Sequence, residues 1–217
     1  MKKTLILVPS LFEYEHLFPH SNQVSVWEKR GVFPRVCGVG PAVSSFMTGH
    51  LLRELKPDHI LLCGLAGAFK QSHLDMGTVV SVSREVLADT GYSERGFPVT
   101  FDEIEMPLFK PAESRAMTCS YDLKPIPGFQ VVSSITVSNV TSDHRIAQFY
   151  YQKYQCGIEN MEGGGAAIAC HFYSKPLEEL RAVSNYVGPR DKESWQMLPA
   201  LKRLREALNE LWEVENQ

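Results

Sequence analysis

Short apolar runs alternate along the chain with segments whose apolar residues recur every three or four positions. This alternation is typical of strands packed between helices, and it predicts an α/β layered fold. The predicted strands cover residues 5–8, 35–39, 59–63, 78–82, 130–137, 157–161 and 180–184.

Two segments have the periodicity of amphipathic helices. Residues 41–55 place apolar side chains at three- and four-residue steps, and the C-terminal leucines from Leu201 to Leu211 do the same, with Pro199 suited to the first turn. Residues 93–128 are polar and interrupted by five prolines. We expect this stretch to form a long excursion or lid outside the core.

Composition narrows the possible classes of protein. The 217 residues, 44% of them hydrophobic, can bury one sizeable core, which indicates one domain or at most two small ones. A formal net charge of -3 gives no general attraction for nucleic acid or an anionic membrane. The apolar run after the two N-terminal lysines breaks at Pro9, too early for a signal peptide or a membrane span.

The five cysteines include no CxxC pair and no zinc-ligand spacing with histidine. An odd number without such spacing favours reduced thiols in a cytoplasm, and we expect no structural metal.

Two glycine-rich stretches follow predicted strands. In "VCGVGPAVSS", Gly38 and Gly40 precede a helix, so backbone N–H groups would face an anion or a polarised water at the strand end. In "LLCGLAGAF", Gly64 and Gly67 flank a predicted turn. Neither stretch is GxGxxG, since Val43 stands where the third glycine would be, so a dinucleotide site is disfavoured. The alternative for each stretch is a tight connection that needs positive φ.

A single carboxylate, Glu162, stands between a predicted strand and three glycines in "IENMEGGGAAIAC". Taken alone, Glu162 is better explained by a helix-start charge that gains from the helix dipole. Twenty-three residues later, Asn185 follows the predicted strand 180–184. A carboxylate and a carboxamide at two strand ends, beside two glycine stretches, could bind a sugar diol and a heterocycle.

The combination of "GVGPA", "GLAGAF" and "ENMEG", with "RAVSN" following, resembles the purine nucleoside phosphorylase and methylthioadenosine/S-adenosylhomocysteine nucleosidase superfamily. Within it, "LADTG", "ITVSNVTSDHRI" and "SNYVGPRDKESW" are most similar to the futalosine hydrolases, enzymes of the alternative menaquinone route. The resemblance runs from Val8 to about Trp195. It implies one nucleoside phosphorylase-like domain over residues 1–217, a three-layer α/β/α fold with a central mixed sheet.

The resemblance also implies roles for individual residues. Glu13 matches the glutamate that activates the hydrolytic water, and we prefer it to Glu15 because its distance from the first strand fits better. Met161 and Glu162 match the pair that holds the ribose. Gly38 and Gly40 would lie by the water, and Ala66 and Gly67 along the nucleoside. Residues 141–146 would shape the base pocket, although a helix N-cap by Ser142 or Asp143 explains their side chains equally well.

Asn185 departs from the aspartate that adenine-specific nucleosidases usually carry. An amide can donate to N7 or a 6-oxo group but cannot protonate a base strongly, so Asn185 favours a hypoxanthine leaving group. Arg35, Arg53 and Arg84 lie outside both glycine stretches, which favours hydrolysis over phosphorolysis.

We therefore expect a cytoplasmic, cofactor-free hydrolase of futalosine with a small-molecule nucleoside as its partner. The resemblance also implies a homodimer. The alternatives are a methylthioadenosine/S-adenosylhomocysteine or aminodeoxyfutalosine nucleosidase, and a nucleoside-binding protein without catalysis.

Overall fold

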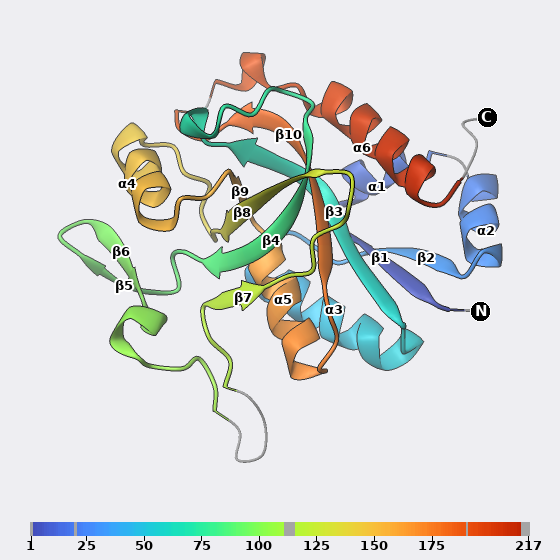
Figure 1. The fold of residues 1–217 in the computed structure, drawn as a ribbon, viewed down its shortest axis with the longest axis horizontal. Coiled ribbons are helices and arrows are strands. Elements are labelled where there is room, and N and C mark those ends of the chain that lie inside the picture. The colour runs from blue at the N-terminus through green and yellow to red at the C-terminus, as the bar shows by residue number, and fades with distance from the viewer. Residues whose placement is uncertain (1, 20, 111–115, 190, 214–217) are drawn as a thin grey trace.

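A mixed sheet forms the centre of the computed structural model, which describes residues 2–19, 21–110, 116–189 and 191–213. In those residues its eight strands are β1 (Thr4–Val8), β2 (Val32–Val36), β3 (His59–Ala68), β4 (Val79–Leu87), β7 (Ser120–Asp122), β8 (Gln130–Thr136), β9 (Ile158–Asn160) and β10 (Glu178–Tyr186). A hairpin of β5 (Gly91–Glu94) and β6 (Phe97–Thr100) stands apart from this sheet (Figure 1).

Strand pairing closes part of the sheet on itself. The order is β10-β4-β8-β9-β3-β1-β2, and β10 also pairs with β3, so β3, β9, β8, β4 and β10 form a ring from which β1 and β2 extend. The β10–β4 and β3–β9 pairs are antiparallel, whereas β10–β3, β4–β8 and β8–β9 are parallel. The expectation of a central mixed sheet is confirmed.

Helices cover both faces of the sheet (Figure 1). The helices are α1 (Leu11–Leu17), α2 (Ser21–Lys29), α3 (Pro41–Leu55), α4 (His144–Tyr154), α5 (Gly163–Phe172) and α6 (Met197–Leu211). Along β1, Leu5 and Leu7 pack into the core that includes α3 and α5, while Ile6 and Val8 face the core that includes α1, α2 and α6. This two-residue alternation places the sheet between two helical layers.

The observed strands differ from the predicted ones in their bounds, and for two of them the difference affects the interpretation of the sequence. The second strand covers Val32–Val36 instead of residues 35–39, and it contains Pro34, which a strand at the sheet edge tolerates because its free side needs no ladder donor. The third strand continues to Ala68, so Gly64 and Gly67 lie within β3 and the predicted turn is wrong. A Cβ at Gly64 would lie 2.8 Å from the Glu13 Oε1 atom, which explains the glycine by close approach.

The proline-rich segment 93–128 is only partly an excursion. It includes most of the β5–β6 hairpin and a 3₁₀ turn at Phe101–Ile104, but β7 pairs with β4. Cys119, Tyr121 and Leu123 are buried in the main core, so the expectation that this whole stretch lies outside the core is wrong. Residues 111–115 lie outside the described part of the chain.

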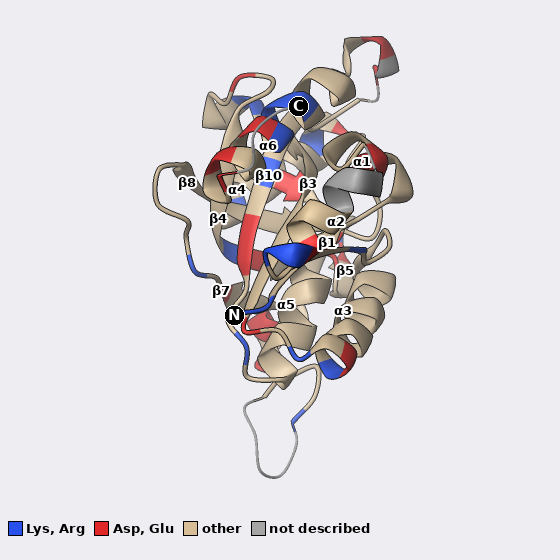
Figure 2. Ribbon diagram, turned by 90° about the vertical axis from the view of Figure 1, so that its right-hand side faces the viewer, with Lys and Arg blue, Asp and Glu red and all other residues tan. Residues whose placement is uncertain are grey.

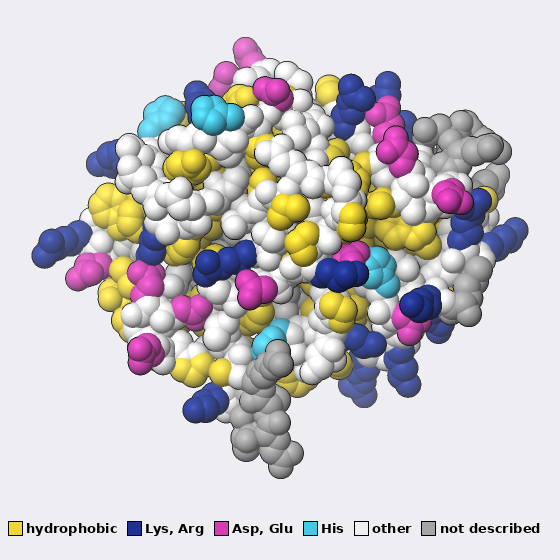
Figure 3. Space-filling model, in the orientation of Figure 1, with side chains coloured by type: hydrophobic (Ala, Val, Ile, Leu, Met, Phe, Trp, Pro, Cys, Tyr) yellow, Lys and Arg dark blue, Asp and Glu magenta, His cyan; other side chains and the backbone are white. Residues whose placement is uncertain are grey.

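The surface carries charges of both signs. Lysine and arginine positions are interspersed with aspartate and glutamate along the ribbon (Figure 2), and hydrophobic side chains reach the surface between them (Figure 3). Within the described ranges, no helix combines the length and apolarity needed to cross a membrane.

Candidate functional site

A cavity of about 200 Å³ lies beside the ends of β1, β3 and β10. This is the side on which open α/β sheets bind ligands, because loops and helix N-termini converge there. The lining residues are Pro9, Ser10, Glu13, Val39, Leu65, Ala66, Gly67, Val140, Glu159, Asn160, Glu162, Ser184, Asn185, Trp195 and Met197.

Glu13 enters this cavity from the first turn of α1. Ser10 is the N-cap of that helix and accepts from the Glu13 N–H at 3.2 Å. The Glu13 carboxylate accepts from the Ser10 hydroxyl at 2.6 Å and from the Leu65 N–H at 2.9 Å. Only 7% of Glu13 is exposed, whereas Glu15 lies on the surface, so the structure brings Glu13 to the cavity.

Glu162 reaches the cavity as the N-cap residue of α5 and is 5% exposed. One carboxylate oxygen accepts from the Gly40 N–H at 3.4 Å, and the other is 3.1 Å from Arg181 Nη1. Burial raises the pKa of Glu162, while the Arg181 charge opposes that shift. Gly38 and Gly40 both have positive φ, of 85° and 88°. The Gly40 N–H donates to Glu162, so this part of the predicted anion or water site is already used by a carboxylate.

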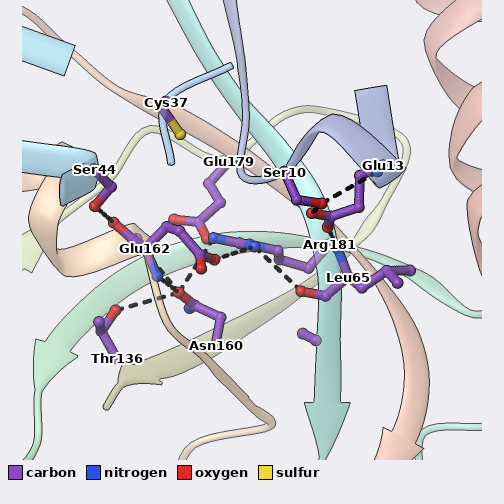
Figure 4. A network of polar contacts seen from close by, with 12 residues as sticks. Ser10, Glu13, Cys37, Ser44, Leu65, Thr136, Asn160, Glu162, Glu179 and Arg181 are labelled. Carbon is purple, nitrogen blue, oxygen red and sulfur yellow. Dashed lines mark hydrogen bonds and ion pairs between the residues drawn. The ribbon is translucent and has the colours of Figure 1, made fainter. Parts of the chain in front are cut away.

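Arg181 is a buried residue beside the cavity that the sequence analysis missed. Its fully buried guanidinium donates to Glu179 at 2.7 Å, to Glu162 at 3.1 Å and to the Leu65 carbonyl at 3.2 Å. Figure 4 shows the end of the Arg181 side chain next to the Glu162 and Glu179 carboxylates, with Glu13 beside Ser10 and Leu65. The signal was present in the sequence, because Glu179 and Arg181 alternate with apolar residues in a buried strand and must face the same side.

A third acid, Glu85, lies fully buried on β4 near this arginine. It accepts from the Thr136 hydroxyl at 2.7 Å and from the Asn160 amide at 2.6 Å. Burial and the neighbouring charge of Glu179 both raise the pKa of Glu85. One arginine therefore faces three buried carboxyl groups, and a neutral Glu85 lowers the electrostatic cost of that cluster.

The three glycines after Glu162 allow α5 to pack closely against this cluster and its neighbours. A Cβ at Gly163 would lie 2.3 Å from Glu85 Oε1, one at Gly164 would lie 2.8 Å from Leu87, and one at Gly165 would lie 2.3 Å from the Pro41 carbonyl oxygen. The Asn160 side-chain oxygen accepts from the Glu162 and Gly163 N–H groups, so it satisfies the first donors of the helix.

Asn185 lies near the end of β10 and lines the cavity. Its Nδ2 donates to the Tyr186 carbonyl at 3.2 Å, and its Oδ1 accepts from the Ser184 hydroxyl at 2.9 Å. A carbonyl can only accept, so the Tyr186 contact fixes the amide orientation and leaves one N–H of Asn185 for a ligand. Gly67 is the β3 partner of Asn185, and a Cβ there would lie 3.0 Å from Nδ2.

Glu159 is a cavity-lining carboxylate on β9 that the sequence did not single out. It accepts from the Thr141 N–H at 3.0 Å and from the Thr141 hydroxyl. Burial raises its pKa to about 7, although the two Thr141 hydrogen bonds oppose that shift. These bonds fix the loop before α4, whose N-cap is Asp143.

Of the remaining predicted site residues, some line the cavity and others do not. Ala66 and Gly67 line the cavity, as does Trp195. Met161 is half-buried in the bend between β9 and α5 and, although described, falls outside the lining, as do Gly38 and Gly40.

Comparisons with known proteins show the family to which this chain is related. The family model of the phosphorylase superfamily matches residues 18–212. The chain is 32% identical to a futalosine hydrolase of Thermus thermophilus over 80% of this chain and 78% of that protein. It is 30% identical to a futalosine hydrolase of Streptomyces coelicolor, over 80% and 75% of the two chains.

Among solved structures, a 5'-methylthioadenosine/S-adenosylhomocysteine nucleosidase of Helicobacter pylori with butyl-thio-DADMe-Immucillin-A has the same fold. Its TM-score is 0.74 at 13% identity, and the match covers 98% of both chains.

Proposed function

Because this chain belongs to the phosphorylase superfamily and, within it, to the futalosine hydrolases, we propose that it hydrolyses the N-glycosidic bond of futalosine and releases hypoxanthine. Membership makes it an N-glycosidic bond hydrolase. The observation that carries the proposal is one cavity whose lining brings together the Glu13 and Glu162 carboxylates and the Asn185 amide.

Glu13 is the proposed general base. Its two oxygens are held by the Leu65 N–H and the Ser10 hydroxyl, and each oxygen keeps a lone pair for a further donor. A water between this carboxylate and C1' of the ribose would lose its proton to Glu13 as the new bond forms. Such a positioned base typically contributes 10²- to 10⁴-fold to the rate.

Glu162 and Arg181 are proposed to hold the sugar. Cleavage builds positive charge on the ribose, and the Glu162 carboxylate can accept from its hydroxyls. The ion pair with Arg181 and the Gly40 N–H fix the direction of this carboxylate before the substrate binds. Such preorganised charge is the usual main source of transition-state stabilisation.

Asn185 is proposed to receive the departing purine. The base gains negative charge as the bond breaks, and the remaining N–H of Asn185 can donate to N7 or to the 6-oxo oxygen. A proton from water completes the release of neutral hypoxanthine. Every step uses side chains and water, so we propose no cofactor.

Hydrolysis is favoured over phosphorolysis by the surroundings of Arg181. This buried guanidinium beside the cavity is already bound to the Glu162 and Glu179 carboxylates. A phosphate dianion there would face both acids, and their charge would repel it.

The test is base release from three nucleosides with and without phosphate. Futalosine, inosine and methylthioadenosine are incubated with the purified protein, and the released base is identified by chromatography. We expect hypoxanthine from futalosine, at a rate that does not depend on phosphate. Adenine from methylthioadenosine as the main product would favour a methylthioadenosine/S-adenosylhomocysteine nucleosidase. Absence of any released base would favour a nucleoside-binding protein without catalysis.

We also propose a homodimer in the cytoplasm. Phe46 and Phe172, exposed by 73% and 55%, flank a groove between α3 and α5 that a second copy would cover. Five free, buried cysteines support a reducing compartment. Light scattering should give twice the chain mass, and F46D should reduce it to the monomer.

A further inference from the structure

Glu159 lies in register with the proposed base-binding residue across three adjacent strands. Gly67 on β3 pairs with Asn185 of β10 on one side and with Glu159 of β9 on the other. Paired residues in neighbouring strands point to the same face of a sheet, and all three residues line the cavity. Asn185 and Glu159 therefore face one space, with the glycine between them.

The width of this space suits the edge of a purine. Strands are about 4.8 Å apart, so residues two strands apart are separated by roughly 10 Å. Gly67 has no side chain to fill the middle, and a Cβ there would already lie 3.0 Å from the Asn185 amide. A flat base can lie across the glycine, with one edge position near Asn185 and another near Glu159.

Hydrogen-bonding chemistry then separates the two kinds of purine. In hypoxanthine, N7 and O6 accept while N1–H donates; in adenine, the 6-amino group donates while N1 accepts. Asn185 offers an N–H to N7 or O6, and a carboxylate can only accept. Each Glu159 oxygen has one contact with Thr141 and keeps capacity for another donor.

Resting on the proposed function, we propose that Glu159 recognises the base by accepting a hydrogen bond from the N1–H of a 6-oxopurine, on the side opposite Asn185. A 6-amino purine would present an unprotonated N1 to this carboxylate, so two acceptors would meet in a buried site. Such mispairing is the kind of contact that discriminates strongly between substrates. Burial raises the pKa of Glu159, and a hydrogen bond from the base N1–H would favour the charged form of this carboxylate.

E159Q separates this role from support of the loop. Glutamine keeps an oxygen for the Thr141 N–H and an amide hydrogen for the Thr141 hydroxyl, so the loop contacts remain. Only the charge and one acceptor are lost. The matched control is T141V, which removes the hydroxyl contact to Glu159 but leaves the carboxylate in the cavity.

The experiment compares kcat/KM for futalosine and aminodeoxyfutalosine, together with the Kd of free hypoxanthine, adenine and 1-methylhypoxanthine. E159Q should weaken futalosine turnover and hypoxanthine binding by about 10- to 100-fold, the range for a hydrogen bond to a charged group. The same variant should leave the 6-amino compounds unchanged or improved, and 1-methylhypoxanthine unchanged. T141V should keep the wild-type preference for the 6-oxo base.

An unchanged ratio between 6-oxo and 6-amino compounds in E159Q, with the variant folded by thermal unfolding, would overturn the proposal. The proposal would also be overturned if T141V lost the preference for the 6-oxo base while E159Q kept it. Failure of the proposed function is distinguishable, because the wild-type protein would then release no hypoxanthine from futalosine, while the base affinities would still test Glu159.

Discussion

Replacing Arg181 by methionine should destabilise the protein and abolish activity together. The substitution keeps an apolar chain of similar length and removes the only cation within 3.1 Å of Glu162 among the described ion pairs. It also removes the 2.7 Å partner of Glu179. Both acids are buried. Removing one partner of a buried ion pair typically costs about 3–5 kcal/mol, because the remaining charge is left uncompensated.

The expected loss can be measured by urea unfolding. For a chain of this size, 1 kcal/mol corresponds to about 2–4 °C in Tm, so R181M should melt about 6–20 °C below the wild type. R35M is the matched control, because Arg35 forms an ion pair with Glu28 at the same 3.1 Å but with about a third of each side chain exposed. It should cost less than about 1 kcal/mol.

A double variant separates stability from activity. E179M/R181M also removes one of the two buried carboxylates that lose their cation in R181M, so it should regain part of the lost free energy of unfolding. Glu162 still lacks its cation in this variant, so turnover should stay low. If the free energies of unfolding of R181M and R35M differed by less than about 1 kcal/mol, the claim that Arg181 stabilises a buried acid cluster would be refuted.

Three further variants test other parts of the site. E13Q should lower kcat by about 10²- to 10⁴-fold while the exposed E15Q leaves it unchanged; equal effects in steady-state assays would remove Glu13 from its role. N185D should shift the preference in kcat/KM toward 6-amino purines, and an unaltered preference would contradict the account of base release. Because burial raises the pKa of Glu85 from its ordinary value of 4.5 to about 8, the native state holds a proton that the unfolded chain releases, so this group makes stability fall as pH rises above about 4.5. E85Q should flatten that fall in urea titrations from pH 5 to 8, and an equally steep fall would contradict it.

Periodic elements were predicted well where local chemistry and packing agree. Helix α3 covers Pro41–Leu55 as predicted, because its apolar spacing and its proline at the first position indicate the same boundaries. Strand bounds were less predictable. Gly64 and Gly67 were predicted as turn residues, yet they stand within β3. They are glycines because Glu13 and Asn185 approach those positions closely.

The candidate site was predicted in part. Glu13, Glu162 and Asn185 meet in one cavity, as the motifs indicated. Arg181 was missed although its alternation with apolar residues in a buried strand was a local signal. Glu159 was missed because its importance depends on pairings between strands that are distant in sequence. Glu159 faces Asn185 only through the β9–β3–β10 register. Closure of the sheet into a ring was likewise not encoded in any local pattern.

The proposed site has two parts whose hydrogen-bond partners differ. On the proposed ribose side, Glu162 contacts Arg181 and Gly40. On the proposed base side, Asn185 contacts Ser184 and Tyr186, and Glu159 contacts Thr141. A change in base preference can therefore arise by substitution at strand ends without disturbing the sugar anchor. Within a lineage of such enzymes, the nucleobase can change while the chemistry at C1' is inherited intact.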